Sequence, residues 1–177
     1  MKQNSLIIFF LFGLIFFTKT CFGQDSLVSK SFLNNKVRLL VPNTFNELSQ
    51  ETLAEKYPNP NLRPSIILTD KEEISSIKII QMPQEVSDTE VARYKSFHIT
   101  NMKKEKYLDW LGDGVKIING RTIGFIKVIY TDRNTFSYFF FTSMDGKLLL
   151  ITYNCLDKLG PALEETTEKI INSLRIE

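Results

Sequence analysis

The side chains that most often carry out catalysis are scarce in this sequence. The only histidine is His98 and, apart from Cys21 near the N-terminus, the only cysteine is Cys155. A Ser-His-Asp or Cys-His mechanism would have to use His98, which lies on the apolar stripe of an expected helix and is interpreted as a packing residue. Cys155 ends an apolar strand and is expected to be a buried structural thiol, because a nucleophilic thiolate needs a nearby histidine and partial exposure.

The sequence motifs of common enzymes and metal sites are also missing. There is no Gly-x-Ser-x-Gly elbow, His-Glu-x-x-His pair or Gly-x-x-x-x-Gly-Lys phosphate loop, and one histidine with one cysteine does not complete a zinc site. Asp109 and Asp113 could bind calcium, but they lack the spacing of a calcium loop. We predict no catalytic residue, no metal and no cofactor. A hydrolytic carboxylate pair among the 20 acids stays an alternative.

Three side chains in or beside expected loops are candidates for contact with a partner. They are Tyr57, Arg63 and Trp110, residue types that are enriched where interfaces carry their binding energy. Tyr57 and Arg63 belong to the segment 56–65 (KYPNPNLRPS), whose prolines predict an ordered, extended loop. We expect the partner to contact the Tyr57–Pro64 loop or the edge of a sheet.

The hydrophobic pattern predicts the elements that position these side chains. Runs of β-branched and aromatic residues alternate with turn signals, and amphipathic helices open at the Ser87 capping box and at Gly160-Pro161. Gly112-Asp113-Gly114 is expected to be a turn between two short strands. The expected strands are 37–41, 65–69, 75–81, 107–111, 115–118, 123–131, 135–142 and 147–155, and the expected helices begin at about 52, 87 and 160 and end near 56, 104 and 176.

The long strands are apolar on both faces. In the segment 135–142 (TFSYFFFT), Phe140 points one way while Phe139 and Phe141 point the other. An antiparallel sheet with one face in water would alternate apolar with polar residues, so both faces need cover. The pattern predicts an α+β domain in which an antiparallel β-sheet meander is covered by helices on both faces, an α/β/α sandwich.

Residues 1–23 have the pattern of a secretory signal peptide. A basic start precedes the apolar run LIIFFLFGLIFF, and cleavage is predicted between Gly23 and Gln24. The run is shorter than the roughly 20 apolar residues of a spanning helix, so no stable membrane insertion is expected after cleavage. Lipidation of Cys21 is the rival interpretation. The preceding Thr18–Thr20 disfavours it, because that recognition site takes an apolar residue and small neutral ones.

The charge of the mature chain argues against several partner classes. The full chain has a formal net charge of +2, but residues 1–23 contain Lys2 and Lys19 and no acid, so the mature chain is neutral. A neutral domain has no overall field to attract nucleic-acid phosphates or anionic lipid, and no nucleic-acid partner is expected. Residues 24–36 form a polar lead-in and 37–177 a single domain of ordinary size. The oligomeric state stays open.

Several segments together carry a resemblance to a known fold: Val37–Pro42 with Phe45, the Tyr57-Pro58 loop before Ser65–Thr69, Asn119–Gly124, the three long strands, and the closing helix ending Ile170–Ile176. Their order resembles the PsbP-like superfamily, which includes the Ran-binding Mog-type proteins and the bacterial DcrB envelope proteins. The resemblance covers nearly all of the mature chain, but it is a fold pattern to which no functional residue is tied. It implies an α/β/α sandwich and a non-enzymatic accessory or binding domain, often exported in bacteria.

These observations predict an exported, periplasmic or secreted, non-enzymatic domain that acts by contact with an unidentified envelope protein. An inhibitor or immunity-type protein is a special case of this function. A carrier of a small apolar ligand or lipid is the first alternative, because the Phe-rich strand at 136–141 offers much aromatic surface. A hydrolase with unrecognised carboxylates is the second, and it requires a cleft with two facing acids of raised pKa.

Overall fold

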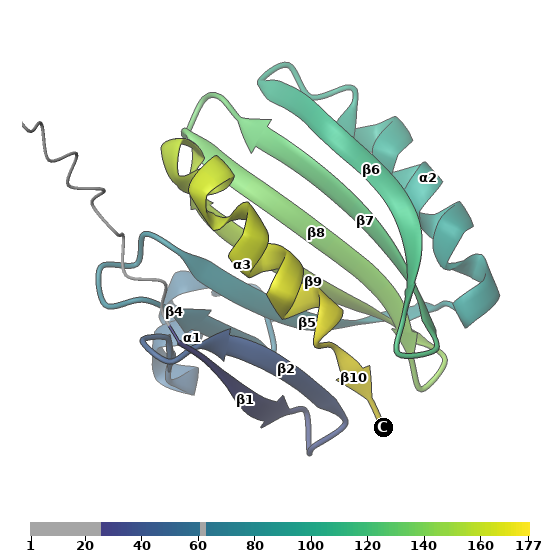
Figure 1. Cartoon of the computed structure of the whole chain (residues 1–177), viewed down its shortest axis with the longest axis horizontal. Helices are drawn as coiled ribbons and strands as arrows, with labels where there is room; N and C mark the ends of the chain where they lie inside the picture. Colours follow the sequence, from purple (N-terminus) through teal and green to yellow (C-terminus); the bar gives the residue numbers. More distant parts are fainter. Residues whose placement is uncertain (1–25, 61–62) are drawn as a thin grey trace, which may run out of the picture.

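The computed structural model describes residues 26–60 and 63–177. The predicted signal peptide, its cleavage site after Gly23, and Cys21 lie outside these described residues. The described strands form two antiparallel sheets, against which three α-helices pack (Figure 1). The helices are α1 (Gln50–Lys56), α2 (Val91–Met102) and α3 (Gly160–Asn172), with single 3₁₀ turns at Asp88–Glu90 and Asp157–Leu159.

The two sheets differ in size. The smaller has the order β1-β2-β10, with β1 at Leu27–Phe32, β2 at Val37–Pro42 and β10 at Arg175–Ile176. The larger has the order β3-β4-β5-β9-β8-β7-β6, with β3 at Asn46–Glu47, β4 at Ile66–Thr69, β5 at Ser76–Glu85, β6 at Leu108–Ile118, β7 at Arg121–Tyr130, β8 at Thr135–Met144 and β9 at Lys147–Leu156.

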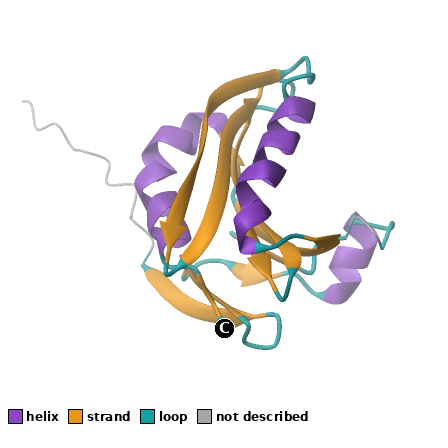
Figure 2. Ribbon diagram, turned by 90° about the vertical axis from the view of Figure 1, so that its right-hand side faces the viewer, coloured by secondary structure: helices purple, strands orange, loops and turns teal. Residues whose placement is uncertain are grey.

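Helices α2 and α3 cover opposite faces of the larger sheet, as Figure 2 shows. On one face Phe140 is buried in a core that includes Ile170 and Ile171 of α3. On the other face Phe141 is buried in a second core with Val91 of α2. The expected α+β fold class, with an antiparallel sheet between helices, is therefore confirmed. Of the aromatic side chains that suggested a carrier, Tyr138, Phe140 and Phe141 of β8 are buried among protein side chains, while Phe136 also lines a pocket of about 510 Å³.

The larger sheet is a meander only in part. Strands β6 to β9 follow one another in space as in sequence, joined by the expected Asn119-Gly120 and Asp145-Gly146 turns. Asn119 and Gly120 both have positive φ angles, 47° and 79°, as a two-residue hairpin turn requires. Strand β5 then pairs with the outer side of β9, although α2 and three strands separate the two in sequence.

The expected polar lead-in at 24–36 contains a strand. Residues Leu27–Phe32 form β1 and pair along their whole length with β2. Most side chains of β1 are exposed or half-buried, because it is an edge strand, and only Phe32 is buried. The ordered domain therefore includes β1 and does not begin at Val37.

The closing helix ends earlier than expected. α3 ends at Asn172, and Arg175–Ile176 form β10, which pairs with Arg38 and Val37 of β2. Ser173 joins the two parts, because its hydroxyl accepts a hydrogen bond of 2.8 Å from the backbone N–H of Leu40. β2 thus packs between the first and the last described segments of the chain.

The prediction of a turn at Gly112–Gly114 is wrong, because β6 runs unbroken from Leu108 to Ile118. Its register against β7 shifts between Trp110 and Gly112, so Leu111 is the extra residue of a β-bulge. Gly114 has a different role: a Cβ atom there would lie 2.7 Å from the ring of Phe125. Within this one strand, Gly112 therefore lies beside the bulge, and Gly114 allows the ring of Phe125 to approach the backbone closely.

Candidate functional site

A groove beside the second half of β5 is the candidate functional site. Strand β4 pairs only with Ser76–Ile79 of β5, so the segment from Ile80 onward extends past the end of β4. The pairing of β5 with β9 is itself irregular between Gln81 and Glu85. Pro83 lies in this irregular stretch and has no N–H to donate to a neighbouring strand. β5 therefore has no neighbour on its outer side from Ile80 onward, and it bulges away from β9 before the two strands pair again at Glu85 and Lys147.

We call this space the β5 groove; its volume is about 630 Å³. Its apolar part comes from Ile80 and Met82 of β5 together with two prolines, and its polar part includes two basic side chains. The residues of the β5 groove are Pro60, Arg63, Ser65, Ile80, Gln81, Met82, Pro83 and Lys147.

A smaller pocket of about 310 Å³ continues along the same strand, where Gln84, Glu85 and Val86 form part of its lining. Its other wall is α2, which contributes Tyr94 and Phe97. The Phe97 side chain is 60% exposed, which is high for a residue of this size. An apolar side chain of a partner could therefore bury surface at both ends of the segment 80–86.

The two basic side chains of the β5 groove form no ion pair within the part of the chain that the structure describes. Neither Arg63 nor Lys147 forms an ion pair with any described residue. Lys78 is similar: its ammonium group lies 5.5 Å from the centre of the Tyr57 ring, and no described carboxylate pairs with it. Arg63 and Lys78 thus carry positive charge without an ion-pair partner among the described residues, whereas Lys147 lies directly opposite Glu85 in the pairing of β5 with β9.

The structure brings two of the three predicted contact residues together. The Arg63 Nε donates a hydrogen bond of 2.9 Å to the backbone carbonyl of Tyr57, and Arg63 lines the β5 groove. Trp110 lies elsewhere, on the outermost strand β6, where its half-buried ring packs with the core beneath α2. The ammonium group of Lys103 lies 5.1 Å from the centre of that ring.

Sequence reasoning missed the part of the groove that β5 and β9 contribute. Ile80, Met82 and Lys147 are adjacent because of long-range strand pairing, which no local pattern reports. The one local signal was Pro83, because a proline inside an apolar strand pattern indicates an edge or a bulge.

His98 and Cys155, the two candidates for nucleophilic chemistry, lie on opposite faces of the larger sheet. His98 stacks on Phe141 beneath α2, with 5.1 Å between the ring centres, and its Nε2 lies 2.7 Å from the Tyr94 hydroxyl. Burial lowers the pKa of His98. Cys155 is buried in the core on the α3 side, where burial and the nearby Asp157 raise the pKa of its thiol to about 12. The two cannot form a Cys-His pair.

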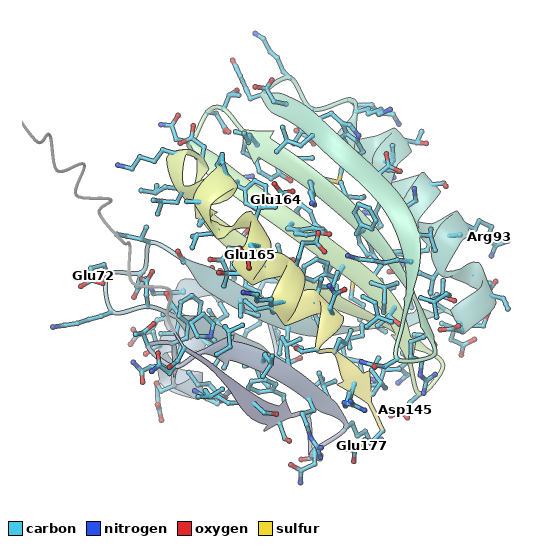
Figure 3. The ribbon with its side chains drawn as sticks, viewed as in Figure 1. Glu72, Arg93, Asp145, Glu164, Glu165 and Glu177 are labelled. Carbon is cyan, nitrogen blue, oxygen red and sulfur yellow. The ribbon has the colours of Figure 1, made fainter. Side chains whose placement is uncertain are left out.

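A cluster of charged side chains joins α3 to strands β6, β7 and β8. Glu168 accepts hydrogen bonds from Lys116 at 2.7 Å and from the Tyr138 hydroxyl at 2.8 Å. Lys127 donates to Glu164 at 2.7 Å and lies 3.1 Å from Glu168. Glu164, labelled in Figure 3, extends from the first turns of α3. The cluster ties the helix to the strands.

This cluster does not supply the acid that hydrolysis requires. Burial alone would raise the pKa of Glu168, but the hydrogen bonds from Lys116, Tyr138 and Lys127 outweigh it and lower that pKa. A general acid needs the opposite shift. Glu168 therefore stays ionised and stabilises the packing of α3.

The two carboxylates considered for calcium point to opposite faces of β6. Asp109 is opposite Ile129 in the register, on the α3 side, whereas Asp113 is opposite Ile126, on the α2 side. Asp113 also forms an ion pair with Lys95 of α2. Within the described ranges, no group of three histidine, cysteine, aspartate or glutamate side chains is arranged to hold a metal ion.

Comparison with known proteins identifies the fold. No protein-family model matches the sequence, and no curated protein matches it. Solved structures do match. Cyanobacterial PsbP (CyanoP) from Synechocystis sp. PCC 6803 has a TM-score of 0.58 and 13% identity, over 89% of this chain and 96% of CyanoP.

Two further structures agree. A single-substitution mutant of Mog1 has a TM-score of 0.52 and 9% identity, over 85% of this chain and 96% of Mog1. PA94 from Pseudomonas aeruginosa has a TM-score of 0.50 and 12% identity, over 85% and 97%. The domain is thus an antiparallel α+β sandwich. Its fold is similar to those of CyanoP, Mog1 and PA94, as the resemblance in the sequence implied.

One further property concerns membranes. Among residues 26–60 and 63–177, no helix is long and apolar enough to cross a bilayer.

Proposed function

We propose that this chain is an exported, non-enzymatic accessory domain that binds a protein of the cell envelope through the β5 groove. The observation that carries the proposal is an apolar strand segment beside basic side chains that form no ion pair with any described residue. Ile80 and Met82 offer apolar surface, while Arg63 and Lys147 offer the positive charge. The signal-peptide pattern of residues 1–23 supports export to the periplasm or beyond.

The partner segment that fits this groove has apolar side chains flanked by aspartate or glutamate. Apolar anchors in the centre of an interface supply affinity, and complementary charges at its rim steer association and set its register. An inhibitor or immunity-type role is included in this proposal, because such proteins also act by covering a partner's surface.

The absence of assembled catalytic groups among the described residues supports a non-enzymatic role. His98 and Cys155 lie on opposite faces of the sheet, and the pKa of Glu168 is lowered. Similar folds in CyanoP and Mog1 are compatible with an accessory role, although their likeness to this chain concerns the fold alone.

A crosslinking experiment in the native envelope tests the proposal. A photoreactive amino acid replaces Met82 in the groove or, as a control, Lys158, which is exposed beside α3. We expect the Met82 probe, and not the Lys158 probe, to capture one partner in stoichiometric amount. Mass spectrometry of the crosslinked peptide is expected to find acidic residues beside the captured segment.

Binding of the purified partner then tests the charges. Arg63→Glu and Lys147→Glu are each expected to weaken affinity roughly tenfold or more and to reduce its salt dependence. Lys158→Glu is the matched control with the same charge change and is expected to leave affinity unaltered. Unchanged affinity in both groove variants would show that the β5 groove is not the contact surface.

A further inference from the structure

The outermost strand of the larger sheet, β6, has one long unpaired side. Its pairing within the described residues is to β7 alone, on its inner side. Val115 and Ile117 project from this strand on the α2 side, and they are 44% and 68% exposed. Natural edge strands are usually protected by charges, prolines or covering segments, because open N–H and C=O groups bind other strands.

The charges of β6 do not protect its outer side, because the domain itself neutralises them. Asp113 forms its ion pair with Lys95 of α2 on one face. Lys116 pairs with Glu168 of α3 on the other face, at 2.7 Å. Each charged side chain is therefore turned inward over its own sheet. The segment from Gly112 to Ile118 presents an edge without free charge.

The geometry of the hairpin determines which backbone groups face outward. The two-residue turn at Asn119-Gly120 makes Ile118 and Arg121 a hydrogen-bonded closing pair. Hydrogen-bonded and non-hydrogen-bonded pairs alternate along an antiparallel ladder. The N–H and C=O groups of Asp113, Val115 and Ile117 therefore point away from β7, toward solvent.

The regular part of this edge has a defined centre. The bulge at Leu111 limits it at one end and the hairpin turn at Asn119 limits it at the other. Val115 is the midpoint of the regular segment 112–118. A second β6 strand running antiparallel would use the whole segment only if a twofold axis passed through Val115.

We propose that a second copy of this chain pairs with the first through antiparallel β6 strands, with the twofold axis at Val115. In this register Val115 lies opposite Val115 of the partner subunit. Asp113 lies opposite Ile117 of the partner subunit, and Gly114 lies opposite Lys116 of the partner subunit. All outward backbone groups of Asp113, Val115 and Ile117 are then hydrogen-bonded.

Competing registers are disfavoured by the bulge or by the hairpin turn. An axis at Asp113 would place Val115 opposite the bulged Leu111 of the partner subunit. An axis at Lys116 would place Asp113 opposite Asn119 of the partner subunit, which lies in the hairpin turn. An axis at Gly114 would place Ile117 opposite the bulged Leu111, where the ladder is interrupted. The Val115 register avoids all three conflicts.

Apolar burial adds to the backbone hydrogen bonds. Val115 and Ile117 from both subunits form one row on the α2 side, in which directly opposite and diagonal neighbours are in reach. On the α3 side, Gly112 and Gly114 present backbone without side chains that could obstruct the second strand. The β5 groove lies away from this edge, so the two surfaces are independent.

Cysteine crosslinking tests both the pairing and its register, in protein beginning at Gln24. Opposite residues of a hydrogen-bonded pair have Cα atoms about 5.5 Å apart, which a disulfide can span. Val115→Cys is expected to form a covalent dimer under mild oxidation. Ile117→Cys is the matched control and is expected not to crosslink, because the two copies lie four residues apart along the strand. Crosslinking of Ile117→Cys in preference to Val115→Cys would overturn the register.

Sedimentation velocity of the unmodified protein tests the dimer itself. We expect a concentration-dependent dimer whose dissociation constant rises roughly tenfold or more in Ile117→Lys. Val28→Lys is the control, because Val28 is 38% exposed on β1, the edge strand of the smaller sheet. Circular dichroism confirms that both variants fold. A monomer at all concentrations, or equal weakening by Val28→Lys, would overturn the proposal.

Discussion

Lys95 of α2 and Asp113 of β6 form an ion pair that ties the helix to the outermost strand. Lys95 is buried, and its aliphatic chain lies against Gly124 of β7, where a Cβ atom would be 3.2 Å from that of Lys95. Because Gly124 has no side chain, α2 can pack closely against β7 at this point. The ion pair connects α2 to β6, and the packing of Lys95 against Gly124 connects the helix to β7.

Removing one partner of this pair is expected to destabilise the domain. Asp113→Asn leaves the buried Lys95 ammonium without its counter-charge, and we expect a loss of about 1–3 kcal/mol in the free energy of unfolding. Urea denaturation measures this loss. Glu165→Gln removes an exposed ion pair with Lys169 and is the control, with no measurable loss expected. An equal effect of the two substitutions would contradict a special role for the buried pair.

Gly114 and Phe125 are expected to be coupled in stability. Gly114→Ala places a Cβ atom 2.7 Å from the Phe125 ring, so the ring must move, and overpacking of this kind costs about 1–3 kcal/mol. In the Phe125→Ala background the same substitution meets no ring and is expected to cost much less. A double-mutant cycle by urea denaturation measures the coupling. Additive effects of the two substitutions would contradict the packing argument.

The stability of the domain is expected to fall on acidification partly because of His98. Burial lowers the pKa of His98 below its ordinary value of 6.5, so the unfolded chain binds a proton more readily than the folded one. The contribution of neutral His98 to the free energy of unfolding is then fully present above pH 6.5. It is lost as the pH falls through the pKa of His98 in the folded state. His98→Gln keeps a hydrogen-bonding group beside Tyr94 but does not titrate.

Urea denaturation at pH 7.5 and at pH 5 compares the two proteins. We expect the stability of His98→Gln to depend less on pH over this interval than that of the unmodified protein. Identical pH dependence would show that His98 has no altered pKa in the folded state.

Cys155 is expected to be inert in the folded domain. The pKa of its thiol is raised to about 12, so almost no thiolate forms near neutral pH, and the side chain is buried. A thiol reagent such as Ellman's reagent is expected to leave native protein beginning at Gln24 unmodified. The same reagent should release one equivalent of thiolate in denaturant. Rapid reaction of the native protein would indicate an accessible thiol.

The sequence predicted the larger sheet and its cover for a clear physical reason. Phe139 and Phe141 point opposite to Phe140, and two apolar faces require two layers of helix. Asn119-Gly120 likewise predicted a hairpin, because that pair readily adopts the positive φ angles of a tight turn. Where side-chain chemistry acts locally, the pattern of residues was sufficient.

Long-range pairing explains what the sequence did not reveal. Gly112 and Gly114 suggested a turn, because nothing local shows that one lies beside a bulge and the other beneath the ring of Phe125. Strand β1 was missed because its polar, exposed side chains suit an edge strand. The contribution of Lys147 to the β5 groove depends in the same way on where β9 places it.

The smaller sheet also has a consequence for the timing of folding. β2 needs β10 beside it and α3 against it, and the hydrogen bond between Leu40 and Ser173 joins residues 133 positions apart. Contacts of such separation form slowly, because the long intervening loop must close before they stabilise anything. A chain that emerges from its N-terminal end therefore cannot complete this sheet until its last strand has also emerged.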